Sequence, residues 1–274
     1  MIEVVTSGVD WITATLPLGA VLDQEWLYNC LQRIDEVVKE GYELEYSTLN
    51  GYQGVKAGGC FVGSRFDGHM VQFSGRFAHS FFDTVYRYDA HISRLDVQTT
   101  VKYKTMPKRV AKEAYRDAIK ENETIPVSRR RKIWIIVGSD GGDTCYVGSA
   151  SSDERGRIYN KEVQSEDPLY SKCWRFECAL RNERATTLAR SIAARLTDRV
   201  QFCSDSTAIW FEKRGVTVPW IFDASIIPIP PLKTQPNDIE KKCNWLAHQV
   251  RPTVEYLLTV MPKDTILQLL GLSE

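Results

Sequence analysis

Apolar residues recur at helical spacing in several stretches of the chain. In residues 23–40 they form a single stripe, with Asp23 placed to cap the amino end and Gly41 placed to stop the helix. Further helices are predicted over residues 76–88, 107–122 and 182–200. A long C-terminal stretch, residues 237–274, also has helical character, interrupted by Pro252 and Pro262.

Alternating apolar and polar residues predict strands over much of the remaining chain. Residues 42–74 form short runs separated by glycines, which is typical of an antiparallel meander with a hairpin turn at residues 67–68. Other strands are expected over residues 4–17, 91–103, 132–137, 144–148, 155–161, 173–181, 208–213 and 216–222. The chain lacks the regular strand–helix alternation of a doubly wound fold. We therefore predict an α+β protein with a largely antiparallel central sheet and flanking helices.

A proline-rich stretch divides the chain near its C-terminal end. Residues 226–236 (IIPIPPLKTQP) have the composition of an extended linker. We therefore expect a main domain over residues 1–225, and a linker with a helical segment over residues 226–274. The apolar end of that segment is expected to dock on the main domain or to bind a partner, and docking is favoured.

Composition limits the class of protein. Of the 274 residues 43% are hydrophobic, which is enough for a buried core. No basic, apolar leader and no run of membrane-spanning length is evident, so a cytoplasmic location without membrane association is expected. The seven cysteines are scattered without a CxxC pair, and neither a zinc site nor a disulfide framework is indicated. The sequence also contains no phosphate-loop motif.

Positive charge is concentrated in residues 102–132, although the net charge of the whole chain is zero. This segment has eleven basic residues against four acidic ones. Such a concentration predicts a surface that faces phosphates, with a solvated helix face as the equally simple alternative.

Two neighbouring predicted strands carry the residues with the clearest chemistry. Because side chains alternate along a strand, Arg157, Tyr159 and Lys161 are expected on one face. Two cations beside a phenol are suited to hold a phosphate and should lower the pKa of the tyrosine. In the strand that follows, Glu177 is expected on a polar face, opposite an aromatic face that belongs to the core. The simpler interpretation is a packed tyrosine on a solvated strand.

An acidic residue also lies in the otherwise apolar strand over residues 91–103. Asp96 follows Arg94 by two residues, so the two side chains point the same way. A buried acid needs a partner, and either an arginine or a metal ion would serve. Spacing alone favours an ion pair between Arg94 and Asp96. For Asp10, an ordinary position at a strand edge is favoured over a role in a site.

Five sequence blocks, in order along the chain, resemble the Rep_trans family. This family contains rolling-circle replication initiators of small plasmids, with related phage initiators and conjugative-element relaxases. The blocks are VDWITATLP, VQFSGRF, SRLDVQTT, DTCYVGSASSDERGRIYNK and WRFECALRNERA. Together they span most of residues 9–185, and the block that contains Tyr159 is the most specific.

The resemblance implies a site-specific, metal-dependent DNA strand transferase. Tyr159 is then the nucleophile, Arg157 and Lys161 stabilise phosphate charge, and Asp96 and Glu177 hold Mg²⁺ or Mn²⁺. The expected products at an origin hairpin are a 5′-phosphotyrosyl link and a free 3′-OH, and the strand is later rejoined. A homodimer and a recruited host helicase are further implications. Contacts to flanking DNA are expected from Lys108, Arg109, Lys112, Arg129, Arg130 and Arg131.

The sequence departs from the family at one position and leaves alternatives open. The strand with Asp96 often carries a second acid in the family, and Thr100 stands in that place here. A relaxase with the same chemistry, a DNA-binding relative without catalysis and a nuclease that uses water remain alternatives. Tyr170 is a possible second acceptor, but we interpret it as structural.

Overall fold

The computed structural model describes residues 2–20, 23–86, 90–107, 109–139, 141–165, 167–225, 246 and 250–269, the last with only the backbone of residues 252, 253 and 267–269. The chain divides into two compact units, Met1–Pro230 and Pro231–Glu274. In the second unit, helices α9 (Arg251–Val260) and α10 (Lys263–Leu269) contact each other. The predicted linker over residues 226–236 lies outside the described residues.

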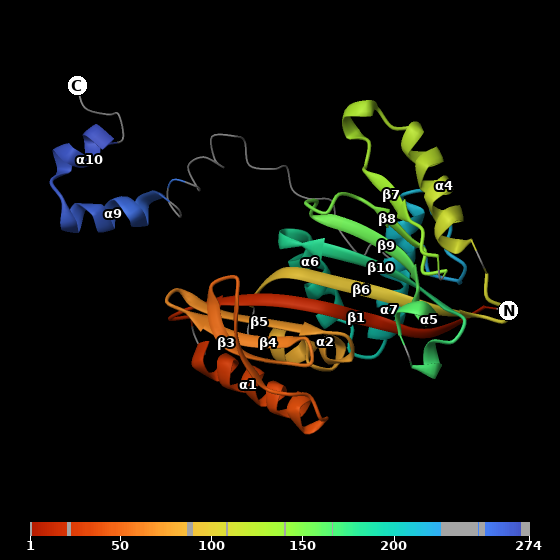
Figure 1. The fold of residues 1–274 in the computed structure, drawn as a ribbon, viewed down its shortest axis with the longest axis horizontal. Helices are drawn as coiled ribbons and strands as arrows, with labels where there is room; N and C mark the ends of the chain where they lie inside the picture. Colours follow the sequence, from red (N-terminus) through yellow and green to blue (C-terminus); the bar gives the residue numbers. More distant parts are fainter. Residues whose placement is uncertain are drawn as a thin grey trace. The chain divides into compact units, whose positions relative to one another are not determined.

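The first unit is built on a ten-stranded antiparallel sheet. The strands are β1 (Ile2–Pro17), β2 (Glu45–Leu49), β3 (Tyr52–Ala57), β4 (Cys60–Arg65), β5 (Gly68–Ser74), β6 (His91–Tyr103), β7 (Ile133–Ile136), β8 (Thr144–Val147), β9 (Glu154–Asn160) and β10 (Cys173–Arg181). Their order across the sheet is β2-β3-β4-β5-β1-β6-β10-β9-β8-β7. Figure 1 shows the long strands β1 and β6 side by side within this sheet. The fold is therefore α+β, as predicted.

Helices cover one face of the sheet and enclose the core. They are α1 (Asp23–Lys39), α2 (Arg76–Ser80), α3 (Phe82–Tyr86), α4 (Val110–Glu123), α6 (Asn182–Ala193) and α7 (Arg199–Glu212). Residues of α1, α4, α6 and α7 share one apolar cluster with Trp174, Phe176 and Leu180 of β10. Phe176 meets Phe211 of α7 edge to face, with ring centroids 5.6 Å apart. The alternate residues of β10 face away from these helices.

Several predicted elements differ in the structure. The prediction of a strand over residues 208–213 is wrong, because residues 208–212 belong to α7, whose side chains are buried on nearly all sides. A helix buried all round loses the polar stripe that marks helical spacing. Residues 216–222 do not form a strand, and the helix expected over residues 182–200 ends at Ala193. Among the described residues, no helix is both long and apolar enough to cross a membrane.

Candidate active site

Four adjacent strands place polar side chains in rows on the face of the sheet that is turned away from the helices. The rows follow from the register of β6, β10, β9 and β8. One row contains Thr100, Arg175, Tyr159 and Thr144, and the next contains Gln98, Glu177, Arg157 and Tyr146. Because directly opposite residues bring their side chains within contact range, residues far apart in the sequence meet here.

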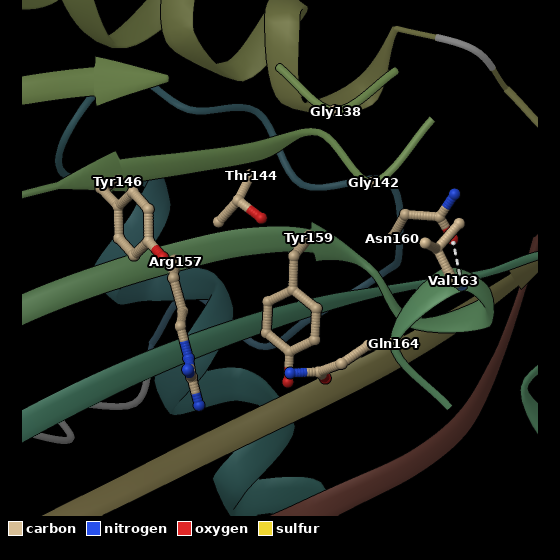
Figure 2. Close-up of a pocket in the computed structure, with 9 residues that line it drawn as sticks. All are labelled: Gly138, Gly142, Thr144, Tyr146, Arg157, Tyr159, Asn160, Val163 and Gln164. Atoms are coloured by element: carbon tan, nitrogen blue, oxygen red, sulfur yellow. Dashed lines mark hydrogen bonds between the residues drawn. The ribbon is translucent and has the colours of Figure 1, made fainter. Parts of the chain in front are cut away.

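Tyr159 lies at the centre of this face. Its side chain is 5% exposed, and its hydroxyl donates a hydrogen bond to Oε2 of Glu177 at 3.3 Å. The tyrosine also lines a cavity of about 380 Å³, between the β7–β8 turn and the short helix α5 (Lys161–Gln164). Figure 2 shows Tyr159 beside Arg157 on β9, with Tyr146 and Thr144 on the neighbouring strand.

Arg157 acts on the pKa of the Tyr159 hydroxyl in the predicted direction, but the predicted net lowering of this pKa is wrong. Burial raises the pKa of Tyr159, and the negative charge of Glu177 raises it further. Arg175 and Arg157 act in the opposite direction without offsetting these effects. The hydroxyl therefore keeps its proton in the resting protein, and a nearby group must accept that proton if the oxygen is to attack.

Each of the two carboxylates predicted to bind a metal ion, Glu177 and Asp96, forms an ion pair with an arginine. Arg157 donates to both oxygens of Glu177, through Nε at 2.7 Å and Nη2 at 2.8 Å. Arg94 holds Asp96 in the same way, at 2.9 and 2.6 Å. The ion pair that spacing favoured for Arg94 and Asp96 is thus confirmed. Burial is the largest effect on both acids, and it raises the pKa of Asp96 and of Glu177.

Sequence reasoning set aside Asp10 and assigned no role to Arg175, yet both belong to this site. Arg175 is 5% exposed and donates through Nε to Thr100 at 2.9 Å and through Nη1 to Asp10 at 2.9 Å. A shift in the β1–β6 register between Val9 and Trp11 leaves Asp10 without a partner residue on β6. The RxE motif could have revealed Arg175, but Asp10 depends on this bulge, which leaves no clear trace in the sequence.

Lys161 reaches the site from a different element than predicted. Strand β9 ends at Asn160, and the Asn160 side chain accepts hydrogen bonds from the first backbone amides of α5. Lys161 therefore begins α5 instead of continuing the strand face. Its Nζ still lies 6.0 Å from the centroid of the Tyr159 ring and 5.2 Å from that of Tyr170. Burial lowers the pKa of Lys161, and Arg175 lowers it further.

The donor chemistry of the two carboxylates suits a hard divalent cation. Mg²⁺ is commonly held by one or two carboxylates, completed by water and substrate phosphate. Asp96 and Glu177 offer such oxygens, and a cation would relieve the cost of burying both charges. The arginines now on those oxygens, Arg94 and Arg157, are about one-third exposed and would have to move aside. Within the described residues no group of three or more His, Cys, Asp or Glu side chains could hold a metal ion.

Helix α4, which carries much of the basic segment, packs on the other face of the sheet. Ala111, Ala114 and Ala118 of α4 pack into the core on the helix-covered face of the sheet. The predicted DNA contacts Arg109, Lys112, Arg129 and Arg130 are exposed and Arg131 is half-buried, while Lys108 lies outside the described residues. Lys112 forms an ion pair with Asp143, and Arg130 donates to two backbone carbonyls. Helix α4 thus packs on the side of the sheet opposite Tyr159, while its Lys112 pairs with Asp143, between Gly142 and Thr144 of the cavity lining.

Comparison with known proteins yields a structural likeness. The chain is similar to a solved structure of a rolling circle replication initiator protein from Geobacillus stearothermophilus, with 23% sequence identity and a TM-score of 0.48. The match covers 72% of this chain and 80% of that one. No family model and no curated protein matches the chain.

Proposed function

We propose that the protein is a nicking and rejoining enzyme that initiates rolling-circle replication of a plasmid-like DNA. It cuts one strand at an origin hairpin through Tyr159 and remains joined to the 5′ phosphate. The observation that carries this proposal is the hydrogen bond from the Tyr159 hydroxyl to Glu177, on a sheet face lined with arginines. The sequence blocks around Tyr159, Asp96 and Glu177 support the same assignment.

The chain provides both a nucleophile and an acceptor for its proton. The Tyr159 oxygen attacks the phosphorus, the bond from phosphorus to the 3′ oxygen breaks, and the tyrosyl proton passes to Glu177. Since burial raises the pKa of Glu177, this carboxylate is a better base than an exposed one. The departing 3′ oxygen takes a proton from solvent and becomes the free 3′-OH. One phosphodiester replaces another, so the reverse reaction rejoins the strand without ATP.

The positive charges around Tyr159 are placed to stabilise a bound phosphate. Arg157 lies directly opposite Glu177, and its guanidinium carbon is 5.2 Å from the centroid of the Tyr159 ring. With Lys161 it can stabilise the charge that develops on the non-bridging oxygens. Arg175 is held by Asp10 and Thr100, so it supports the buried side of the site and does not face its open side. Asp96 and Glu177 would hold a divalent ion, which would polarise the phosphate further when bound.

The remaining parts of the proposal concern partners. The exposed cations of the basic segment would contact flanking duplex through its phosphates. A homodimer would supply a second Tyr159, and a host helicase would open the duplex beyond the nick. A relaxase for conjugation uses the same chemistry at a different DNA site, and the buried Tyr159–Glu177 hydrogen bond favours either enzyme over an inactive DNA-binding relative. We place the activity in the cytoplasm, where plasmid DNA is replicated.

Transfer of label to the protein tests the chemistry. A library of labelled hairpin oligonucleotides is incubated with the protein and Mn²⁺, and the products are separated on a denaturing protein gel. Label at the size of the protein is expected for the wild type and absent for Tyr159→Phe. Tyr170→Phe is the matched control, because Tyr170 lies beside the same Lys161 without contacting Glu177. It should retain the labelled band.

Two results would overturn the proposal. Cleavage by Tyr159→Phe without protein-bound label would identify a nuclease that uses water. Loss of the labelled band in Tyr170→Phe, with Tyr159→Phe still active, would move the nucleophile to Tyr170.

A further inference from the structure

An aromatic–arginine platform, formed by Trp134, Tyr146 and Arg155, lies on the same sheet face as Tyr159. Trp134 on β7 pairs with Tyr146 on β8, and their rings are stacked with centroids 5.0 Å apart and planes 20° apart. The guanidinium carbon of Arg155, on β9, lies 4.2 Å from the Tyr146 centroid and 4.9 Å from that of Trp134. Two stacked aromatic rings are unusual on a sheet face that contacts only solvent, where polar side chains are typical.

Arg155 differs from Arg94, Arg157 and Arg175 on this face in lacking an acidic partner. Arg94, Arg157 and Arg175 each form an ion pair with a carboxylate. Within the part of the chain that the structure describes, Arg155 forms no ion pair, and its Nε is buried without a hydrogen-bond partner. The charged groups that act most strongly on it include three further cations, Arg157, Arg181 and Arg94. A buried N–H donor without a partner, surrounded by other cations, favours the binding of an anion.

The platform adjoins the cavity that contains the nucleophile. Tyr146 lies directly opposite Arg157 and lines that cavity together with Tyr159, as Figure 2 shows. Arg155 precedes Arg157 by two residues on the same face of β9. A DNA strand that presents a phosphate to Tyr159 and runs along β9 past Arg157 therefore meets Arg155 and the two rings beside it.

We propose that this platform binds an unpaired segment of the DNA strand next to the bond that Tyr159 cuts. Arg155 contacts a phosphate, and Trp134 with Tyr146 stacks a base. Proteins that hold single strands combine these two elements, because each base has an aromatic face and each nucleotide a charge. Bases paired in a duplex already stack on each other and cannot stack on Trp134 and Tyr146. The proposal rests on the proposed function and adds how the single strand is held.

Salt dependence separates the phosphate contact from the stacking contact. Binding of a fluorescein-labelled oligothymidylate is followed by anisotropy at increasing salt concentration. In Arg155→Gln the slope of log affinity against log salt should become shallower by about 0.7, which is the contribution of one phosphate contact to a single strand. Arg155→Lys retains the charge and should retain the slope. Trp134→Leu should weaken binding by about 5- to 150-fold with the slope unchanged.

Controls distinguish the platform from general charge and from catalysis. Arg190→Gln removes an exposed cation from α6, on the helix-covered face, and should bind the single strand as the wild type does. Binding of a blunt duplex should be the same in Trp134→Leu and in the wild type. Equal slopes in Arg155→Gln and the wild type, or unchanged affinity in Trp134→Leu, would refute the platform. Single-strand binding that persists in Tyr159→Phe, without any covalent product in the wild type, would refute only the proposed chemistry.

Discussion

Replacing Gly156 by alanine should push β9, the strand that carries Tyr159, away from the core. Gly156 lies on β9 between Arg155 and Arg157, with its missing side chain directed toward α7. A Cβ at this position would lie 2.3 Å from the Trp210 ring and 2.9 Å from the ring of Phe211. Contacts this short are not found between real side chains, so either β9 or α7 must move.

Trp210 has little freedom to move aside. It is 3% exposed, and the guanidinium carbon of Arg214 lies 3.7 Å from the centroid of its ring. Arg214 is fixed in turn by the Trp210 carbonyl and by Glu154. Overpacking of a core costs about 1–3 kcal/mol. For a unit of this size each kcal/mol lowers the unfolding midpoint by about 2–4 °C, so a loss of about 2–12 °C is expected.

Thermal unfolding, followed by circular dichroism and by tryptophan fluorescence, measures this loss. Trp210→Phe provides a smaller ring in the same place, and a double-mutant cycle isolates the clash. The two substitutions together should cost less than the sum of each alone. A Gly156→Ala protein that unfolds at the wild-type temperature, or a cycle with no coupling, would show that β9 is not held by this contact.

Two further substitutions test the site and the pH dependence of the fold. Glu177→Gln should reduce the rate of covalent-product formation at Tyr159 by about 10²- to 10⁴-fold, because an amide cannot accept the tyrosyl proton; an unchanged rate in single-turnover gels would contradict this role. Burial lowers the pKa of His79, Arg199 lowers it further and Asp83 opposes them. The unfolded chain therefore binds the proton more readily, so stability is complete above about pH 6.5 and falls as the pH drops below it. Urea unfolding across this range should show a weaker pH dependence in His79→Gln, and an identical dependence would disprove the assignment.

Alternation along β9 and β10 made the centre of the site predictable from the sequence. Once Arg157 and Tyr159 share a face and Glu177 lies on the polar face of the next strand, antiparallel pairing brings them together. The sign of the Tyr159 pKa shift was not predictable in this way. It depends on how deeply the ring is buried, and burial is decided by packing around the strand rather than by the residues within it.

Irregular features and pairing register account for most of what the sequence did not predict. Asp10 enters the site because β1 contains a bulge, and a shift of one residue would turn its side chain to the other face. Trp134 and Tyr146 meet only because β7 and β8 pair in one register. In α7 buried residues, polar ones among them, surround the helix, so no apolar stripe distinguished it from a buried strand.

Zero net charge is a poor guide to what this sheet face can bind. Basic and acidic residues balance over the whole chain. On the face that carries Tyr159, the arginines outnumber the acids: Arg94, Arg155, Arg157, Arg175 and Arg181 against Asp10, Asp96 and Glu177. Because screening limits the interaction of exposed charges to about 10 Å, a phosphate responds to these neighbours and not to the acids elsewhere. The local excess of positive charge is therefore the quantity that decides whether DNA can be held at Tyr159.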